Sequence, residues 1–420
     1  MRGHAGERRV EWHAFGPVGD TAFRALFTAV VLLAALEPIR GLSGGATWRP
    51  GTVGAKVGGR VTRARPALAA GLLLSGCAFT ANVLPVPAAV VMAAVFPLLT
   101  SVYLSREFAG YVTEDDDGTR HFKVHHHLHL VGMALLGTAG AGLAAVATRN
   151  IDVTFWLAQG LWGAVAAHYF VSAVSKVRKR GMRWPDRRLF PFYLTLFARF
   201  RAGDGETVRE TGPGWLLVRR PRWGVLVLWA ALLLEFSTPL MLLGWWPRAV
   251  IGLGLVLFHL CSRWLLAVDF RENAMLAGLA ALPLPYATGS GFGPQWPAVA
   301  VFAVCGALSL VLDDRVYPFS NLPMFADAYR PSPVVTLRSG DGSTLHATPQ
   351  ALGCSTAGLS REYAAADDPA AFRAEVRRRA AAAGTVLPAG ITLWVETVDV
   401  TPTGEVRTAH RRLGTLASAN

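Results

Sequence analysis

The 420-residue sequence has little charge and few cysteines. Asp, Glu, Lys and Arg make up 16% of the residues, hydrophobic residues make up 52%, and the mean hydropathy is +0.35. This charged fraction is well below the roughly 25% of soluble globular domains, so an ordinary soluble protein is excluded. The cysteines, Cys77, Cys261, Cys305 and Cys354, form no CxxC pair. The sequence therefore predicts neither a disulfide framework nor a zinc site.

Lysine is also scarce, with four residues among 41 basic ones. An arginine guanidinium stays protonated in proteins, whereas the amine of a desolvated lysine can lose its proton. Lys176 closes an apolar run and opens the basic segment 176–180. Such basic segments are typical of juxtamembrane anchors. Both interpretations of Lys176, anchor and reactive amine, stay open on this evidence.

Apolar runs long enough to cross a bilayer are abundant. Nine candidate spans lie at about 21–39, 67–84, 87–104, 129–147, 152–174, 223–243, 247–268, 273–289 and 296–312. A chain in lipid must satisfy its backbone polar groups within each segment, so these runs predict helices. The expected fold class is an all-α polytopic membrane bundle of about nine transmembrane helices with a small α+β cap. The expected location is the cell membrane, crossed several times.

Composition divides the chain into four parts. They are an N-terminal tail at 1–20, a transmembrane helical domain at 21–312, a membrane-proximal connection at 313–330 and a small soluble α+β domain at 331–420. Within the soluble domain, the Ser-Gly-Asp-Gly-Ser segment at 339–343 predicts a hairpin turn between two strands. Residues 369–383 favour a helix, and 391–400 alternate as a strand does, with a further strand near 406–413.

The net charge of +13 could indicate nucleic-acid binding, but its location favours a membrane surface. The loop at 176–222 holds 13 basic and 4 acidic residues. Cytoplasmic loops and anionic lipid head groups account for such a loop without nucleic acid. Membrane lipid is therefore the expected partner, and the C-terminal domain is expected in the cytoplasm. Leu189–Phe200 is too short to span and predicts an interfacial or re-entrant helix.

A polar stripe runs along the apolar segment that ends at Lys176. His168, Ser172 and Lys176 are spaced i, i+4, i+8 and share one helix face. An ionisable residue inside a membrane span is a functional hypothesis by default. The structural alternative is that the stripe packs against polar groups of another helix.

Two further spans carry ionisable residues. Glu235 lies in the middle of an apolar run, four residues before Pro239, which removes a helical hydrogen bond. His259 and Arg263 follow at i, i+4 on the neighbouring span. We expect Glu235, His259 and Arg263 to form one network in the bundle interior. Such a network can stabilise a fold as readily as it can bind a ligand.

A histidine-rich segment spans residues 121–129 and holds five histidines. Its HxxxH and HxxHH spacings resemble those of di-iron membrane oxygenases. Those enzymes use further histidine clusters elsewhere, which this sequence lacks. No metal site is therefore predicted, and the entry of a helix at the membrane interface is the favoured interpretation.

Three motifs in chain order resemble the horizontally transferred transmembrane family, which includes the vitamin K-dependent γ-glutamyl carboxylase. The first is Tyr169-Phe-Val-Ser-Ala-Val-Ser-Lys176, followed by Trp184. The second is Leu234–Pro239 with Phe258-His259-Leu260, and the third is Pro318–Phe325, similar to an element that follows the last helix of many bacterial members. Together they cover about residues 20–330.

The resemblance implies an enzyme with an amine base at Lys176, acting on a quinone or a lipid. It implies carboxylase-like chemistry, or a quinone-linked lyase or oxidoreductase. His168 would orient the amine or relay a proton, and Glu235, His259, Arg263 and Trp184 would bind the substrate. The alternative is a non-catalytic membrane binding or scaffold protein. A transporter is a weaker alternative, because the sequence shows no internal repeat.

Overall fold

The structure is a computed structural model that describes most of the chain. The described residues are 17–42, 48, 52–105, 111–114, 120–123, 126–150, 153–203, 205, 212–266, 270–282, 295–312, 317–319, 331–345, 352, 356–364, 366, 368–388 and 390–416. The chain divides into two compact units. The first unit comprises Met1–Ser175, Leu232–Leu260 and Asp269–Pro323, and the second comprises Lys176–Ala231, Cys261–Val268 and Met324–Asn420.

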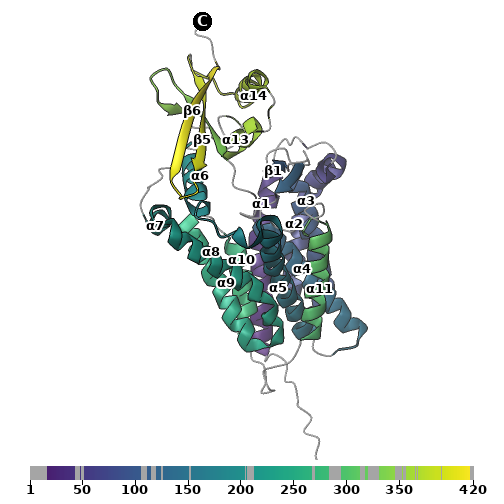
Figure 1. The fold of residues 1–420 in the computed structure, drawn as a ribbon. Coiled ribbons are helices and arrows are strands. Elements are labelled where there is room, and N and C mark those ends of the chain that lie inside the picture. The colour runs from purple at the N-terminus through teal and green to yellow at the C-terminus, as the bar shows by residue number, and fades with distance from the viewer. Residues whose placement is uncertain are drawn as a thin grey trace, which may run out of the picture. The chain divides into compact units, whose positions relative to one another are not determined.

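The first unit is built from helices, with one short hairpin (Figure 1). Complete within it are α1 (Pro17–Gly41), α2 (Val53–Thr80), α3 (Pro85–Leu104), β1 (Tyr111–Glu114), β2 (Arg120–Lys123), α4 (His126–Ala147), the 3₁₀ helix η2 (Thr238–Leu243), α10 (Arg271–Ala281) and α11 (Trp296–Leu312). Most of α5 (Val153–Arg180), the end of α8 (Pro221–Ser237) and most of α9 (Trp245–Leu266) also belong to it. Buried aromatic and aliphatic side chains, among them Phe27, Phe79, Met92 and Leu161, form its core.

Glycines allow the backbones of three of these helices, α4, α5 and α11, to come into direct contact. A Cβ atom on Gly137 of α4 would lie 2.6 Å from the carbonyl oxygen of Gly160 on α5. A Cβ atom on Gly163, one turn further along α5, would lie 2.3 Å from the carbonyl oxygen of Ala298 on α11. Small residues at such crossings are typical of helix packing in membranes, where close van der Waals contact replaces the hydrophobic effect.

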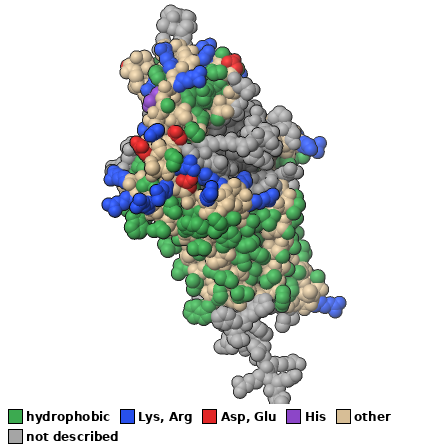
Figure 2. Space-filling view, viewed as in Figure 1, with side chains coloured by type: hydrophobic (Ala, Val, Ile, Leu, Met, Phe, Trp, Pro, Cys, Tyr) green, Lys and Arg blue, Asp and Glu red, His purple; other side chains and the backbone are tan. Residues whose placement is uncertain are grey.

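Five helical segments are long and apolar enough to cross a membrane. They are Gly19–Gly41, Pro85–Leu104, Leu128–Ala147, Pro221–Leu243 and Trp245–Leu265. Large hydrophobic side chains are exposed on these segments, and they cover much of the helical surface drawn in Figure 2. A soluble protein rarely exposes an apolar surface of this extent, so these segments favour membrane insertion.

The expected number of nine spans is not confirmed among the described residues. Each predicted span coincides with a helix, but α10 has 11 residues and α11 has 17. At 1.5 Å per residue, α10 is roughly 17 Å long and is too short for a bilayer core. The reason is local, since Pro283 and Pro285 follow Leu282 and end the helix. Helix α5 is long enough, but its polar side chains lower its mean hydropathy.

The second unit contains the predicted α+β domain. Its antiparallel sheet has the order β4-β3-β5-β6, with β3 at Ser332–Arg338, β4 at Thr344–Leu345, β5 at Thr392–Val400 and β6 at Val406–Thr415. The predicted hairpin at 339–343 and the predicted helix are confirmed, the latter as α14 (Pro369–Ala382). Helix α13 (Thr356–Ala364) was not predicted. Both helices pack on the sheet face that carries Val335, Leu393 and Val395.

The opposite sheet face is covered by a helix from the middle of the chain. Helix α6 (Leu189–Gly203) packs Phe192 and Leu196 against Val334, Val398 and Val400. Arg199 of α6 pairs with the buried Glu396 of β5 at 3.0 Å. The segment expected to be an interfacial helix is therefore helical, and its apolar face packs against the sheet.

The second unit also contains η1 (Gly181–Arg183) and α7 (Pro213–Arg219). The predicted connection at 313–330 lies outside the described residues except for 317–319.

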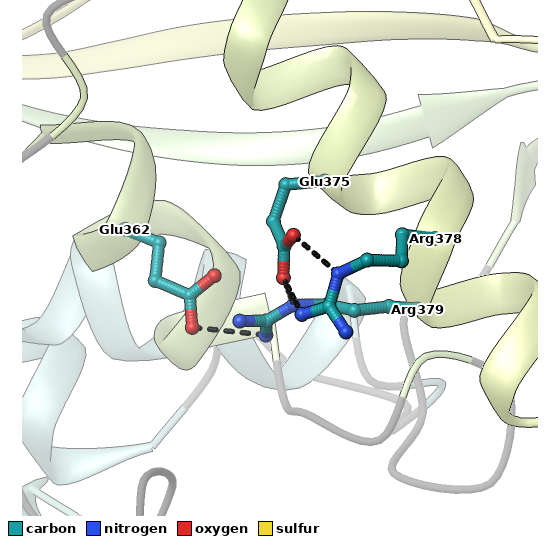
Figure 3. Close-up of polar contacts among 4 residues, drawn as sticks. All are labelled: Glu362, Glu375, Arg378 and Arg379. Carbon is teal, nitrogen blue, oxygen red and sulfur yellow. Dashed lines mark hydrogen bonds and ion pairs between the residues drawn. The ribbon is translucent and has the colours of Figure 1, made fainter. Parts of the chain in front are cut away.

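A chain of carboxylates and guanidinium groups joins α13 to α14 (Figure 3). Glu375 contacts Arg378 at 2.6 Å and Arg379 at 2.8 Å, and Arg379 also contacts Glu362 at 2.9 Å. Hydrogen bonding to Arg378 is the main reason that the pKa of Glu375 falls from 4.5 to about 2, with Arg379 adding to it. Because the folded pKa lies below the ordinary value, this contribution to stability is present above pH 4.5 and is lost as the pH falls toward 2.

We expect Glu375→Gln to flatten the acid dependence of stability in the second unit between about pH 4.5 and 2. The effect should stay below about 1 kcal/mol, because solvent screens a partly exposed pair. Chemical denaturation followed at several pH values would measure it. Glu405→Gln is the matched control, since Glu405 is exposed and contacts Arg407 at 3.8 Å. An unchanged pH slope in Glu375→Gln would contradict the assignment.

Candidate functional site

The first unit holds a buried pair of side chains that can exchange a proton. The hydroxyl of Tyr169 on α5 and Nε2 of His259 on α9 form a hydrogen bond. Each side chain is 3% exposed. The buried side chain of Asn273 on α10 lies within interaction range of the Tyr169 hydroxyl, so three helices supply the group. The rings of Phe258 and Phe270 lie 5.1 and 5.6 Å from the imidazole and exclude water from it.

The carboxylate of Glu235 on α8 lies beside the next turn of α5. Ser172, three residues after Tyr169, donates a hydrogen bond of 3.5 Å to Oε1 of the buried Glu235 on α8. Residues three apart share one helix face, so α5 presents its hydroxyl groups to both α8 and α9. The hydroxyl of Thr238, at the start of η2, shares its hydrogen between the carbonyl oxygens of Ala166 on α5 and Glu235 on α8, each at 2.9 Å. This bond holds the end of α8 against α5.

The helical geometry changes where Pro239 was expected to disturb it. Helix α8 ends at Ser237, and the 3₁₀ helix η2 continues from Thr238 to Leu243. Proline lacks the amide hydrogen that an α-helix needs at this position. Glu235 therefore lies in the last turn of α8 beside an irregular backbone. Polar groups at such places face the bundle interior, because an unsatisfied polar group in hydrocarbon costs several kcal/mol.

Lys176 and Trp184 meet in the second unit. Lys176 is 3% exposed, and its Nζ lies 4.9 Å from the centre of the Trp184 ring. Gly181 makes the reversal possible, because its φ of +62° belongs to the left-handed region that favours glycine. The chain then returns through η1, and the buried indole covers the end of α5. A buried amine beside an aromatic face differs from a head-group anchor, because such an anchor keeps its terminal group in water.

The predicted site residues differ in their burial. Glu235 and His259 are buried as expected, and His168 is buried with its ring edge-on to Tyr169 at 5.1 Å. The expected interior position of Arg263 is wrong, because its side chain is exposed near the end of α9. The i, i+4 spacing had placed Arg263 on the same helix face as His259. A long basic side chain near a helix end can nevertheless extend to the surface, and Arg263 does so. Lys176, Trp184 and Arg263 belong to the second unit.

Tyr169 and Asn273 were not predicted as site residues. Tyr169 stands directly after His168 in an apolar run, and Asn273 is a lone amide in a predicted span. The presence of a polar side chain inside an apolar helix could have marked both residues as site candidates. The sequence did not show which helices are neighbours, so it could not bring these two residues together.

Histidine and carboxylate groups form no metal centre in the part of the chain that the structure describes. No three His, Cys, Asp or Glu side chains come together there. The side chains of His121, His125, His126 and His127 lie outside the described residues. Nδ1 of His129, the last of the five histidines, hydrogen-bonds to the carbonyl oxygen of Pro318 at 2.8 Å and fixes the segment after α11 against α4.

The fold and the buried cluster define the chain as a helical protein with several apolar, membrane-length segments and an α+β domain. No family model, curated protein or solved structure matches it. The resemblance to the horizontally transferred transmembrane family therefore stays a prediction.

Proposed function

We propose that this chain is an integral membrane protein, similar to the horizontally transferred transmembrane family, that binds a quinone or lipid-like molecule and moves a proton. The observation that carries the proposal is the hydrogen bond between Tyr169 and His259, both buried within apolar helices. Ionisable groups are expensive in such a place and usually serve a function.

The donor set fits the polar end of a quinone. When Nε2 of His259 carries the hydrogen of its bond to Tyr169, the Tyr169 hydroxyl can donate to a carbonyl oxygen of the ligand, as the amide of Asn273 can. The rings of Phe258 and Phe270 supply flat apolar surface of the kind that ligand sites use around a few polar groups. When bound, a quinone would supply two-electron chemistry that is coupled to protons.

The chain's own residues would handle the proton. An imidazole has an ordinary pKa near 6.5 and can both accept and return a proton near neutral pH. His259 accepts from or donates to the Tyr169 hydroxyl, and Glu235, next to Ser172, offers a further acceptor on the same stretch of α5. Lys176 is the amine base that the resemblance implies, and its side chain is buried beside Trp184.

Co-purification tests this proposal. We expect the full chain, purified in a mild detergent and extracted with organic solvent, to release a quinone or a related prenyl lipid by mass spectrometry. Tyr169→Phe should lower the retained amount about tenfold, the size of effect expected for one lost buried hydrogen bond. Tyr103→Phe is the matched control, because the Tyr103 hydroxyl also donates a hydrogen bond inside the helical unit, to Glu37 at 3.0 Å.

Two outcomes would overturn the proposal. One is that the parent protein releases only bulk phospholipid. The other is that Tyr103→Phe loses as much ligand as Tyr169→Phe, which would show a general loss of structure. The non-catalytic alternative is favoured by the bond from Thr238 to the Ala166 carbonyl, since such bonds hold helices together without a ligand. In that case Tyr169→Phe would lower the unfolding temperature and no ligand would be found.

A further inference from the structure

Exposed arginine and tryptophan side chains gather where α7 meets α8. Arg219 ends α7, Arg220 follows it, and Arg222 and Trp223 lie in the first turn of α8. All three arginines are exposed, and Trp223 is 56% exposed. The large apolar side chains of Leu216 and Leu226, on either side of them in sequence, are exposed as well. The feature thus combines positive charge with apolar surface.

The end of α9 adds a second arginine and tryptophan pair. Arg263 is exposed, and Trp264, at 72% exposure, is among the most exposed large side chains of the protein. Helix α7 touches this end of α9, because a Cβ atom on Gly214 would lie 2.2 Å from the carbonyl oxygen of Leu265. Helix α7, whose last residues carry the first group, therefore packs against the end of α9 that carries the second.

Acidic side chains do not neutralise this positive charge within the same segments. From residue 212 to residue 266 the sequence holds one acidic residue, Glu235, and it is buried. The turn at Gly404 approaches Pro221, but the neighbouring Glu405 contacts Arg407 at 3.8 Å. On the face drawn in Figure 2, Lys and Arg side chains likewise gather beside hydrophobic ones.

We propose that these residues form an arginine–tryptophan surface that binds the head groups of anionic phospholipids. The surface consists of Arg219, Arg220, Arg222, Trp223, Arg263 and Trp264. A planar guanidinium group matches the geometry of a phosphate and can bind it through two hydrogen bonds. Tryptophan prefers the depth of the head groups, because its ring is apolar and its N–H is polar. The occupant is therefore a lipid at the membrane surface.

Native mass spectrometry of the full chain tests the surface. The protein is exchanged into mixed micelles with equal amounts of phosphatidylglycerol and phosphatidylcholine, and the retained lipids are counted. We expect phosphatidylglycerol to be retained in excess. The triple variant Arg219→Gln/Arg220→Gln/Arg222→Gln should lower that excess at least about tenfold, since each basic residue near the surface contributes.

The matched control removes the same charge elsewhere. Arg407→Gln/Arg411→Gln/Arg412→Gln changes three exposed arginines on β6 and should keep the excess. Because the first triple variant could fail to insert, Trp223→Leu/Trp264→Leu serves as a second variant. It retains every charge and should lower the excess about threefold.

Three results would overturn the proposal. Equal retention of both lipids by the parent protein would show no preference for anionic head groups. Equal losses in the two triple variants would show a general effect of net charge. Displacement of the lipid by millimolar inorganic phosphate would identify a small-anion site in place of a lipid surface.

Discussion

Gly137→Leu is expected to remove nearly all folded protein. The Cβ atom of any larger residue would lie 2.6 Å from the carbonyl oxygen of Gly160, and that atom belongs to the backbone of α5. Neither helix can yield without separating the packed faces of α4 and α5. Overpacking in a core commonly costs 1–3 kcal/mol, and a backbone clash in place of a movable side chain exceeds it. We expect the yield of monodisperse protein in size-exclusion chromatography to fall below about a tenth of the parent's.

A neighbouring glycine of the same helix provides the control. Gly140 is exposed and has nothing within 4 Å of an added Cβ atom. Gly140→Leu makes the same chemical change three residues away and should leave the yield unchanged or improve it, because leucine is the better helix former. Equal yields from the two variants would show that α4 and α5 do not cross at Gly137.

Lys176→Arg is expected to leave the fold intact and abolish base chemistry. The guanidinium of arginine can also lie over the Trp184 face, so the variant should still insert and fold. Arginine cannot act as a base, since its guanidinium group stays protonated in proteins. We expect oxygen-dependent consumption of a hydroquinone by the purified protein, followed by ultraviolet absorbance, to fall at least about a hundredfold, within the usual range for loss of a general base.

Lys179→Arg is the control for this substitution. Lys179 is exposed, three residues from Lys176 on the same helix. Its variant should keep the full rate. If Lys176→Arg also keeps the full rate, Lys176 is a structural cation and the assignment of the base is wrong.

Much of the helical architecture could be predicted because apolar runs report directly on burial in lipid or protein. The run at 87–104, for example, corresponds closely to α3 at Pro85–Leu104. The glycine signal at 339–343 likewise predicted the turn between β3 and β4, since few residues tolerate its backbone geometry. The predicted span at 273–289 extends beyond α10, which ends at Ala281, and residues 283–289 of that prediction lie outside the described part of the chain.

The composition of the buried cluster could be predicted only in part. Glu235 and His259 were expected inside because ionisable side chains in apolar runs avoid lipid. Their partners depend on which helices are neighbours, and a single sequence does not contain that information. Tyr169 reaches His259 across 90 positions of the chain, so its role appeared only with the packing of α5 against α9.

The covering of the sheet by α6 has a consequence for the order of synthesis. Helix α6 ends at Gly203 and β3 begins at Ser332, so 332 − 203 = 129 positions separate a helix from the strands that bury its apolar face. At roughly 5–20 residues per second, the ribosome needs on the order of ten seconds to supply those strands. During that time Phe192 and Leu196 need another apolar environment. The bilayer surface can supply that environment until the strands are made. The flanking arginines at 187, 188, 199 and 201 would hold the helix of the nascent chain at this surface.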